Sequence, residues 1–370
     1  MKGWGLAAAG VLLLSCACQT TAAPSPPAAG TAPAAASAPP TASPAAGSGS
    51  PAPPLEVVRV GSILNASDAP FYLAQERGYL REEGLEMEIT QFDGAQRAIA
   101  PLGADQLDVA GGGPGPGLFN AIQRGIPLRI VADRSRAVPG AKFNCLVVRK
   151  ALLDSGAVRS FADLRGRVFA ENVPAVLTTA LVERELRQAG VSPQELTWTV
   201  LSFSDMLNAF ANEAVDAGVM VEPFVTVGEQ RGVFQCWKPT GDMEPNFQIA
   251  VLLYGPVFAE QRRETARRFM VAYLRGVRDY YRAFFGDGQG RAEVLELISR
   301  VTGIRDLSLL DRISPAWMDP NGSVNTASLR FVQHWYLERG DLTGEVEVDQ
   351  IVDPSFAEYA LSRIGRYPTP

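Results

Sequence analysis

From about residue 55 onward, apolar residues recur along the chain in two alternating patterns. The runs LEVVRVGSI (55–63) and LEMEITQF (85–92) alternate apolar and polar residues with a period near two, which predicts strands. Between them, DAPFYLAQERGYLREEG (68–84) predicts one helix, with Asp68 as its cap and Gly84 after its end. Strand, helix and strand in this order predict a βαβ unit.

The alternation continues through the first two thirds of the chain. We expect helices over about 95–102, 117–124 and 205–212, and strands at LDVAGG, PLRIVAD, FNCLVVRK, LTWTVL and AGVMVEPF. The run FADLRGRVFAENVPAVLTTALVERELRQAGV predicts strand, turn and helix again, and from Glu260 the pattern is mainly helical. The sequence therefore predicts an α/β fold of two units in series, each a parallel sheet covered by helices on both faces.

The first 54 residues have a different character. Lys2 and the apolar run from Gly5 to Leu14 are typical of an export signal, and the run is too short for a permanent membrane-spanning helix. LLSC, ending at Cys16, resembles a bacterial lipobox, which predicts a signal peptide over 1–15 and lipidation of Cys16, with Cys18 as the alternative. Signal cleavage without lipid is the other interpretation. Residues 16–54 are rich in Ala, Pro, Ser, Thr and Gly, which predicts a tether.

The composition argues against several functions. The chain has 370 residues and a net charge of −6, which speaks against nucleic acid or an anionic membrane surface as partner. With His334 as the one histidine and four cysteines in no zinc-binding spacing, we expect no histidine-based triad, no metal site and no cofactor. No later run is apolar enough to span a membrane, so the lipid would be the only anchor. In an exported protein, Cys145 and Cys236 could form a disulfide or remain buried thiols.

The glycine-rich stretch DVAGGGPGPGLF (108–119) lacks what a phosphate-binding loop needs. A Walker loop has Lys and then Ser or Thr after its glycines, whereas Leu118 and Phe119 follow here. The dinucleotide fingerprint needs backbone N–H donors where this stretch has prolines. The stretch therefore does not predict a nucleotide site.

Five blocks in order carry a family resemblance: DAPFYLAQERGYLREEGLEMEI, QLDVAGGG, SFADLRGRVFAENVPAVLTTALVERELRQAGV, AVDAGVMVEPF and FVQHWYLERGDL. Together they resemble the solute-binding proteins of nitrate, sulfonate, taurine and thiamine-pyrimidine importers. The resemblance implies a type II periplasmic-binding-protein fold, with two lobes around a cleft and two crossover segments, near Val148 and Val251. The expected division is lobe one at 55–147, lobe two at 148–250, and the rest of lobe one with C-terminal helices at 251–370.

Candidate ligand-binding residues follow the predicted strands, because open α/β sheets bind ligands at the carboxyl ends of their parallel strands. They are Ser62, Asn65, Phe71, Gly112, Gly113, Pro114, Asn172, Val173, Pro174, Thr178, Glu222 and Phe224. Each also has a structural interpretation, as a turn, a helix cap or a core residue.

Their chemistry suggests different contacts. The glycines would let the backbone pass close to a solute, or they serve only a turn that needs positive φ. Backbone N–H groups near Asn172, together with Thr178, could bind an anionic or carbonyl group. Glu222 could accept from an amine or amidine, or pair with an arginine between the lobes. Phe71 and Phe224 could stack on a flat ligand. Arg134 and Arg136 could meet an anion or lie on the solvated surface.

The resemblance implies a lipid-anchored receptor that captures a small organic solute by cleft closure and delivers it to the permease and ATPase of an ABC importer. An enzyme similar to thiamine-pyrimidine synthases is an alternative, but those carry a cysteine-rich motif and a reacting histidine that this chain lacks. A ligand-binding sensor subunit is another alternative. Glu222 favours an amine-bearing heterocycle over sulfonate or nitrate as the solute.

Overall fold

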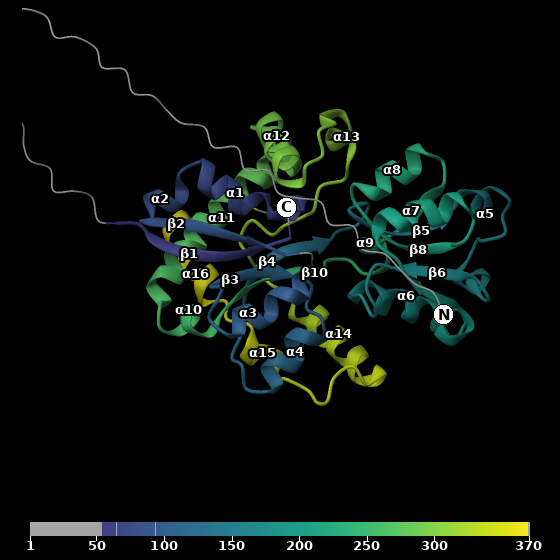
Figure 1. Ribbon diagram of the computed structural model, residues 1–370, viewed down its shortest axis with the longest axis horizontal. Coiled ribbons are helices and arrows are strands. Elements are labelled where there is room, and N and C mark those ends of the chain that lie inside the picture. The colour runs from purple at the N-terminus through teal and green to yellow at the C-terminus, as the bar shows by residue number, and fades with distance from the viewer. Residues whose placement is uncertain (1–53, 64, 93, 369–370) are drawn as a thin grey trace, which may run out of the picture. The chain divides into compact units, whose positions relative to one another are not determined.

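The computed structural model describes residues 54–63, 65–92 and 94–368 (Figure 1). These residues belong to one compact unit. The predicted signal peptide, the lipidation of Cys16 and nearly all of the predicted tether lie outside them. Among the described residues, no helix combines the length and the apolar character that a membrane crossing requires.

Two five-stranded sheets form the framework of the fold. The first has the order β2-β1-β3-β10-β4, formed by β1 (Glu56–Ser62), β2 (Leu85–Gln91), β3 (Val109–Gly112), β4 (Arg129–Ala137) and β10 (Phe247–Tyr254). The second has the order β7-β6-β8-β5-β9, formed by β5 (Asn144–Arg149), β6 (Val168–Glu171), β7 (Thr197–Val200), β8 (Ala217–Val221) and β9 (Phe234–Pro239).

Both sheets are mixed, so the prediction of purely parallel sheets is wrong. In the first sheet β10 lies between β3 and β4 and runs antiparallel to both. In the second, β5 lies between β8 and β9 and runs antiparallel to both. Each of these antiparallel strands comes directly after a segment that joins the two sheets. The expected parallel pairing holds for β1, β2 and β3 in the first sheet and for β6, β7 and β8 in the second.

Helices cover both sheets (Figure 1). With the first sheet lie α1 (Ala69–Glu76), α2 (Tyr79–Glu82), α3 (Ile99–Gly103), α4 (Pro116–Gln123), α10 (Pro256–Glu260), α11 (Arg263–Phe285), α12 (Arg291–Thr302), α13 (Leu307–Arg312), α14 (Thr326–Arg339), α15 (Val348–Ile351) and α16 (Ser355–Ile364). With the second lie α5 (Lys150–Asp154), α6 (Leu177–Gln188), α7 (Phe203–Ala211), α8 (Phe224–Gln230) and α9 (Thr240–Met243). Short 3₁₀ helices, η1 (Ala66–Asp68), η2 (Ala95–Ala98), η3 (Phe161–Leu164) and η4 (Pro193–Glu195), begin or replace helical turns.

The single helix predicted over 68–84 is two helices in the structure. Gly78 has a φ of +75°, a left-handed conformation that ends α1 before α2 begins. Gly84, with a φ of +71°, then follows the end of α2 as expected. The glycine at 78 was visible in the sequence, but a helix interior tolerates a glycine, so the pattern alone did not predict the break.

Two segments, 138–143 and 240–246, join the sheets. Val148 and Val251, near which the crossings were expected, lie inside β5 and β10, and each of these strands belongs wholly to one sheet. The crossings therefore precede the expected positions by a few residues. A structure with two lobes and two crossover segments agrees with the expected fold class.

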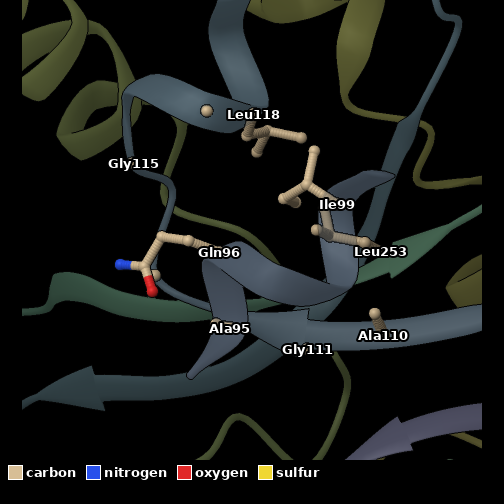
Figure 2. A pocket seen from close by; sticks show the side chains of 11 residues that line it. Ala95, Gln96, Ile99, Ala110, Gly111, Gly115, Leu118 and Leu253 are labelled. Atoms are coloured by element: carbon tan, nitrogen blue, oxygen red, sulfur yellow. The ribbon is translucent and has the colours of Figure 1, made fainter. Parts of the chain in front are cut away.

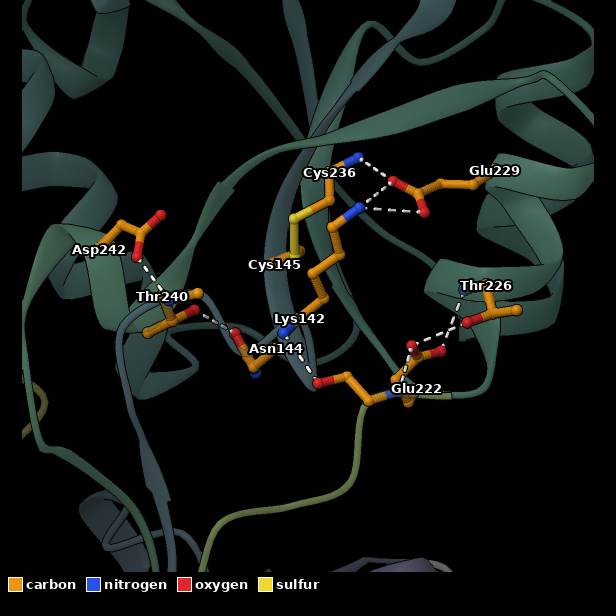
Figure 3. The surroundings of a disulfide bond; sticks show 11 residues. Lys142, Asn144, Cys145, Glu222, Thr226, Glu229, Cys236, Thr240 and Asp242 are labelled. Carbon is orange, nitrogen blue, oxygen red and sulfur yellow. Dashed lines mark hydrogen bonds and ion pairs between the residues drawn. A yellow bond between two sulfur atoms is a disulfide. The ribbon is translucent and has the colours of Figure 1, made fainter. Parts of the chain in front are cut away.

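A disulfide between Cys145 and Cys236 lies beside both crossing segments (Figure 3). It joins β5, which follows the first crossing, to β9, which precedes the second. The hydroxyl of Thr240 donates to Asn144 Oδ1 at 2.6 Å, which links the same two chain regions again. Of the two alternatives for these cysteines, the structure therefore shows the disulfide.

Candidate ligand-binding site

The turn after β1 is built around a buried ion pair. Asp68 is fully buried and accepts from the Ser62 hydroxyl at 2.8 Å and from the Ile63 N–H at 3.1 Å. Its carboxylate also pairs with Arg134, of which 1% is exposed. Ser62 therefore helps to hold the turn, and Arg134 is not a surface residue: it is buried with Asp68, and its Nε has no hydrogen-bond partner in the protein.

Asn65 and Phe71 also have structural roles in this region. Asn65 caps η1 by accepting from the N–H and the hydroxyl of Ser67, at 3.0 and 2.7 Å. Phe71 is 1% exposed, and its ring centroid lies 5.3 Å from that of Tyr273 in the core behind the sheet. The prediction that Phe71 stacks on a ligand is therefore wrong, because core side chains already cover its ring.

The three glycines at the end of β3, Gly111, Gly112 and Gly113, are required by close packing. None of Gly111, Gly112 and Gly113 has a positive φ, so the unusual backbone considered from the sequence is absent at these three positions. A Cβ atom on Gly112 would lie 2.0 Å from the Ala95 Cβ, and one on Gly113 would lie 2.8 Å from Leu177 Cδ2. Leu177 begins α6, so the glycine turn of the first lobe meets the first turn of a second-lobe helix.

A narrow pocket with a volume of about 10 Å³, room for about one water molecule, lies over the glycine turn (Figure 2). Its lining is glycine backbone and mainly apolar side chains: Ala95, Gln96, Ile99, Ala110, Gly111, Gly112, Gly113, Gly115, Gly117, Leu118 and Leu253. Gly112 and Gly113 thus line the pocket, whereas Pro114 is buried beside it and is not part of the lining.

The turn between β6 and α6 folds around a buried carboxylate. Glu171, 6% exposed, accepts from the Ala175 N–H at 3.2 Å and the Thr179 hydroxyl at 2.7 Å. Burial raises the pKa of Glu171, against these hydrogen bonds. Because α6 begins only at Leu177, the expected helix cap near Asn172 and Val173 and the expected place of Pro174 in the first turn are wrong. Asn172 and Val173 are half-buried and Pro174 is exposed.

Two buried hydroxyls near the contact between the lobes have no hydrogen-bond partner in the protein. They are the Oγ1 of Thr178, in the first turn of α6, and the Oγ of Ser135, in β4, and each residue is 1% exposed. Thr178 follows Leu177, which packs against Gly113. A Cβ on Gly113 would also lie 3.4 Å from the Ile249 carbonyl oxygen of β10. Ser135 pairs with Ala250 in the next strand. Buried hydroxyls are normally satisfied, so these two are candidates for contact with a solute.

Glu222 links the two lobes. The residue follows β8, is 8% exposed, and accepts from the Thr226 hydroxyl at 2.8 Å and the Thr226 N–H at 3.0 Å (Figure 3). Its Oε1 also accepts from the Ser314 N–H at 3.0 Å, and Ser314 lies in the segment between α13 and α14. Burial raises the pKa of Glu222. The expected link between lobes is thus present, but its donor is a backbone N–H rather than an arginine.

Phe224 differs from Phe71 because it is only half-buried. Its ring stacks on that of Phe203, with 5.5 Å between the centroids, and the two rings follow β8 and β7. The structure therefore leaves part of Phe224 accessible. Of the twelve candidates, Gly113 and Thr178 are brought to the same contact between lobes, whereas Asn65 and Phe71 serve the internal structure of the first lobe.

Comparison with known proteins identifies the family. The family model described as NMT1/THI5 like matches residues 65–283, which is more than half of the chain. The chain belongs to the NMT1/THI5-like family. A search of curated proteins gives no match.

Solved structures with the same fold are 14 to 20% identical to this NMT1/THI5-like chain. The periplasmic aliphatic sulphonate binding protein SsuA from Escherichia coli has a TM-score of 0.65 at 20% identity, over 80% of this chain and 92% of SsuA. The periplasmic nitrate-binding protein NrtA from Synechocystis PCC 6803 has a TM-score of 0.65 at 14% identity, over 84% of this chain and 89% of NrtA. The desulfurization enzyme DSZB has a TM-score of 0.58 at 16% identity, over 84% of this chain and 99% of DSZB. The predicted two-lobed periplasmic-binding-protein fold is confirmed.

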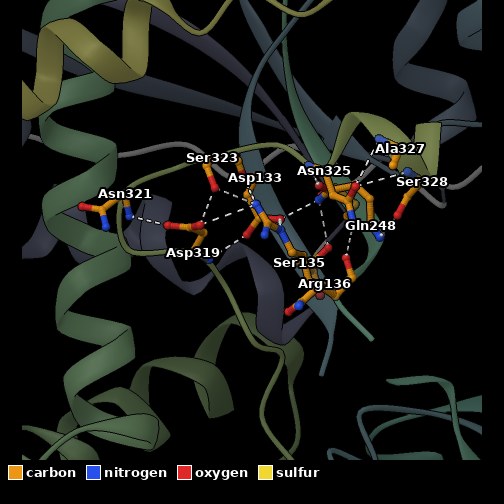
Figure 4. Close-up of polar contacts among 12 residues, drawn as sticks. Asp133, Ser135, Arg136, Gln248, Asp319, Asn321, Ser323, Asn325, Ala327 and Ser328 are labelled. Atoms are coloured by element: carbon orange, nitrogen blue, oxygen red, sulfur yellow. Dashed lines mark hydrogen bonds and ion pairs between the residues drawn. The ribbon is translucent and has the colours of Figure 1, made fainter. Parts of the chain in front are cut away.

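A polar network beside the crossings was missed in the sequence of this NMT1/THI5-like protein (Figure 4). Asp133 in β4 accepts from Gln248 Nε2 at 2.5 Å and from the Asp319 N–H at 2.7 Å. Burial raises its pKa to about 6. Gln248 Nε2 also donates to the Ser135 carbonyl at 3.2 Å, and Arg136 lies beside Asp133 and Asp319. The sequence signal for this network is the polar run DRSR (133–136) at the end of an otherwise apolar strand. That run was interpreted either as an anion contact or as solvated surface.

Proposed function

We propose that this protein is an extracytoplasmic solute-binding lipoprotein of an ABC importer. It captures a small organic solute between its lobes and delivers it to the permease and ATPase subunits, with no reaction. The observation that carries the proposal is the meeting of turns from both lobes, where Gly113 packs against Leu177 and the hydroxyls of Thr178 and Ser135 are buried without partners. Lipidation at Cys16 would hold the protein at the outer face of the membrane.

The charges around this contact favour an amine-bearing heterocycle over a sulfonate or nitrate. The charge of Arg134 is balanced by that of Asp68, so the pair adds no net charge to the site, although Arg134 Nε has no hydrogen-bond partner in the protein. Glu171 and Glu222 are buried at the strand ends of the second lobe, and the hydrogen bonds that they accept come from uncharged donors. A nearby anion would be repelled whenever either group is ionised, whereas a ligand N–H could donate to it.

A second candidate function is catalysis, because DSZB, with the same fold, is an enzyme. Two observations weigh against it. The His334 side chain is 75% exposed on α14, and its Nε2 lies 3.1 Å from Glu338 Oε1. Cys145 and Cys236 form a disulfide, so neither supplies a thiol nucleophile. A sensor subunit would use the same site and differ only in its membrane partner.

The test is a thermal-shift screen of residues 55–370 against alkanesulfonates, nitrate, aminopyrimidines and other amine-bearing heterocycles. A solute at a hundred times its dissociation constant should raise the free energy of unfolding by about 2.7 kcal/mol. The amine-bearing compounds should give the largest shifts. If a sulfonate or nitrate gives them instead, the ligand class proposed here is wrong although the binding function holds.

Thr178→Val tests the site itself with a change of nearly equal shape. Because Thr178 Oγ1 has no partner in the protein, the free energy of unfolding should stay the same or rise slightly. The affinity for the solute found in the screen should fall about tenfold. Thr90→Val, on exposed β2, is the control and should leave the affinity unchanged. A Thr178→Val protein with unchanged affinity would remove Thr178 from the site.

A further inference from the structure

Helix α14 is fixed to the first lobe at both ends. At its start, the Asn325 N–H donates to Gln248 Oε1 at 2.9 Å, and the Ser328 hydroxyl oxygen accepts from the Gln248 N–H at 3.2 Å. Just beyond its end, the Asp341 carbonyl accepts from Asn120 Nδ2 of α4 at 3.0 Å. Because Gln248 lies in β10 and both strands neighbouring β10 belong to the first sheet, α14 should move with that sheet.

The same helix binds α6 of the second lobe through one buried carboxylate. The Glu183 side chain is 4% exposed. Its Oε2 accepts from Trp335 Nε1 at 2.9 Å, and its Oε1 accepts from Arg339 Nη1 at 3.0 Å. Arg187, one turn along α6, also donates to Oε2 at 3.0 Å. Two of the three donors to this carboxylate thus come from the opposite lobe.

Apolar packing surrounds these hydrogen bonds. Trp335 and Tyr336 are 3% and 1% exposed, and they belong to one apolar cluster with Leu177 and Leu181 of α6. The Tyr336 hydroxyl also donates to the Ala175 carbonyl at 3.2 Å, in the turn that precedes α6. The contact between α14 and α6 is therefore largely apolar, with the buried Glu183 carboxylate at its centre, and hydrogen bonds to a buried carboxylate are stronger than in water.

We propose that Glu183, Trp335 and Arg339 form a latch that holds the two lobes closed over the solute site. Moving α6 away from α14 would leave the Glu183 carboxylate with Arg187 alone and would expose two aromatic side chains to water. Such opening costs free energy through the lost charge-assisted hydrogen bonds and the exposed apolar area. A contact made only in the closed form favours that form, and it therefore tightens solute binding without touching the solute.

The latch can be tested without any solute, so its failure is separate from failure of the proposed function. Spin labels at Glu88→Cys, on exposed β2, and Gln188→Cys, at the end of α6, report the distance between the lobes by pulsed electron resonance. The measurement uses residues 55–370, which form one compact unit, and because Cys145 and Cys236 are joined in the disulfide, only these two sites are labelled. Glu183→Gln should raise the ratio of open to closed molecules about tenfold or more.

Two further variants make the result specific. Trp335→Phe keeps an aromatic ring but removes the indole N–H, so it should shift the distances in the same direction as Glu183→Gln. It also tests the latch if Glu183→Gln fails to fold. Glu338→Gln removes the same charge from an exposed position of α14 and should leave the distances at their wild-type values. Distances that are unchanged in Glu183→Gln or Trp335→Phe, or shifted equally in Glu338→Gln, would overturn the latch.

Discussion

At the scale of single residues, Asp133 shows how burial changes the chemistry of a side chain. It is fully enclosed where β4 meets β10 and the 317–323 segment, and burial raises its pKa to about 6 although Arg136, Gln248 and the Asp319 N–H favour the charged form. The carboxylate of Asp319 adds to the rise. A group with this environment makes protein stability depend on pH.

The direction of that dependence follows from the pKa. Because the pKa of Asp133 is higher in the folded protein than the usual value near 4, the folded state binds more protons than the unfolded state between about pH 4 and 6. The free energy of unfolding should therefore fall as pH rises through this window, by about 3 kcal/mol from this group. Asp133→Asn cannot titrate and should lack this contribution.

Urea unfolding of both proteins at pH 4, 5, 6 and 7 measures the difference. Carboxyl groups distant from Asp133 contribute equally to the two proteins, so the change in slope reports Asp133 together with its neighbour Asp319. Asp349→Asn, at a side chain that is 73% exposed, serves as the control. Parallel pH profiles for wild type and Asp133→Asn would show that burial does not raise this pKa.

Gly112 gives a second prediction at this scale. A Cβ there would lie 2.0 Å from the Ala95 Cβ, so Gly112→Ala should force η2 away from β3 and cost about 1–3 kcal/mol of stability. Gly117 lies in α4 with nothing within 4 Å of an added Cβ, so Gly117→Ala should stabilise by about 0.5–1 kcal/mol. Urea unfolding measures both, and effects of the same sign would contradict this account of the glycine turn.

Other residues show why sequence reasoning reached only part of the site. The positions after strands were predictable, because a strand end is visible in the pattern and Gly113, Thr178 and Glu222 follow from it. What each side chain touches was not predictable. Phe71 turned inward because its partners Phe269 and Tyr273 come from a helix two hundred residues later in the chain.

At the scale of elements, the disulfide between β5 and β9 is the feature with the largest expected effect on stability. The two cysteines are 91 residues apart, and a closed loop of that length restricts the unfolded chain strongly. The pair Cys145→Ser and Cys236→Ser should therefore lower the free energy of unfolding by about 2–5 kcal/mol. Urea unfolding with and without reductant measures this loss.

Reductant provides the control for that experiment. It should lower the unfolding midpoint of the wild-type protein and leave the double variant unchanged. Equal midpoints for oxidised and reduced wild type would contradict a stabilising disulfide.

Most of the elements themselves were predictable. Alternating apolar and polar residues indicated most strands of both sheets, and cap residues indicated helix ends. The errors arose where a distant element decides the outcome. The mixed sheets depend on the insertion of β10 between β3 and β4 and of β5 between β8 and β9, which no local pattern encodes. The late start of α6 at Leu177 has a local cause instead: the preceding turn folds around the buried Glu171 carboxylate, which accepts from Ala175 and Thr179.

At the scale of the whole molecule, three contacts join the two lobes. Glu222 meets the 313–315 segment, Gly113 meets Leu177, and Glu183 meets α14. These contacts join the lobes around the candidate site, and a solute bound there would add contacts to both. The proposed capture by closure would use these contacts and needs no reacting group.

The central claim is that the protein binds a small solute reversibly and leaves it unchanged. Calorimetric titration of residues 55–370 with the strongest solute from the thermal screen, followed by recovery of that solute and its analysis by mass spectrometry, tests the claim most directly. We predict one solute bound per chain, weaker binding to Thr178→Val, and recovery of the solute intact. Conversion of the solute into a product, or tight binding that Thr178→Val leaves unchanged, would contradict the account.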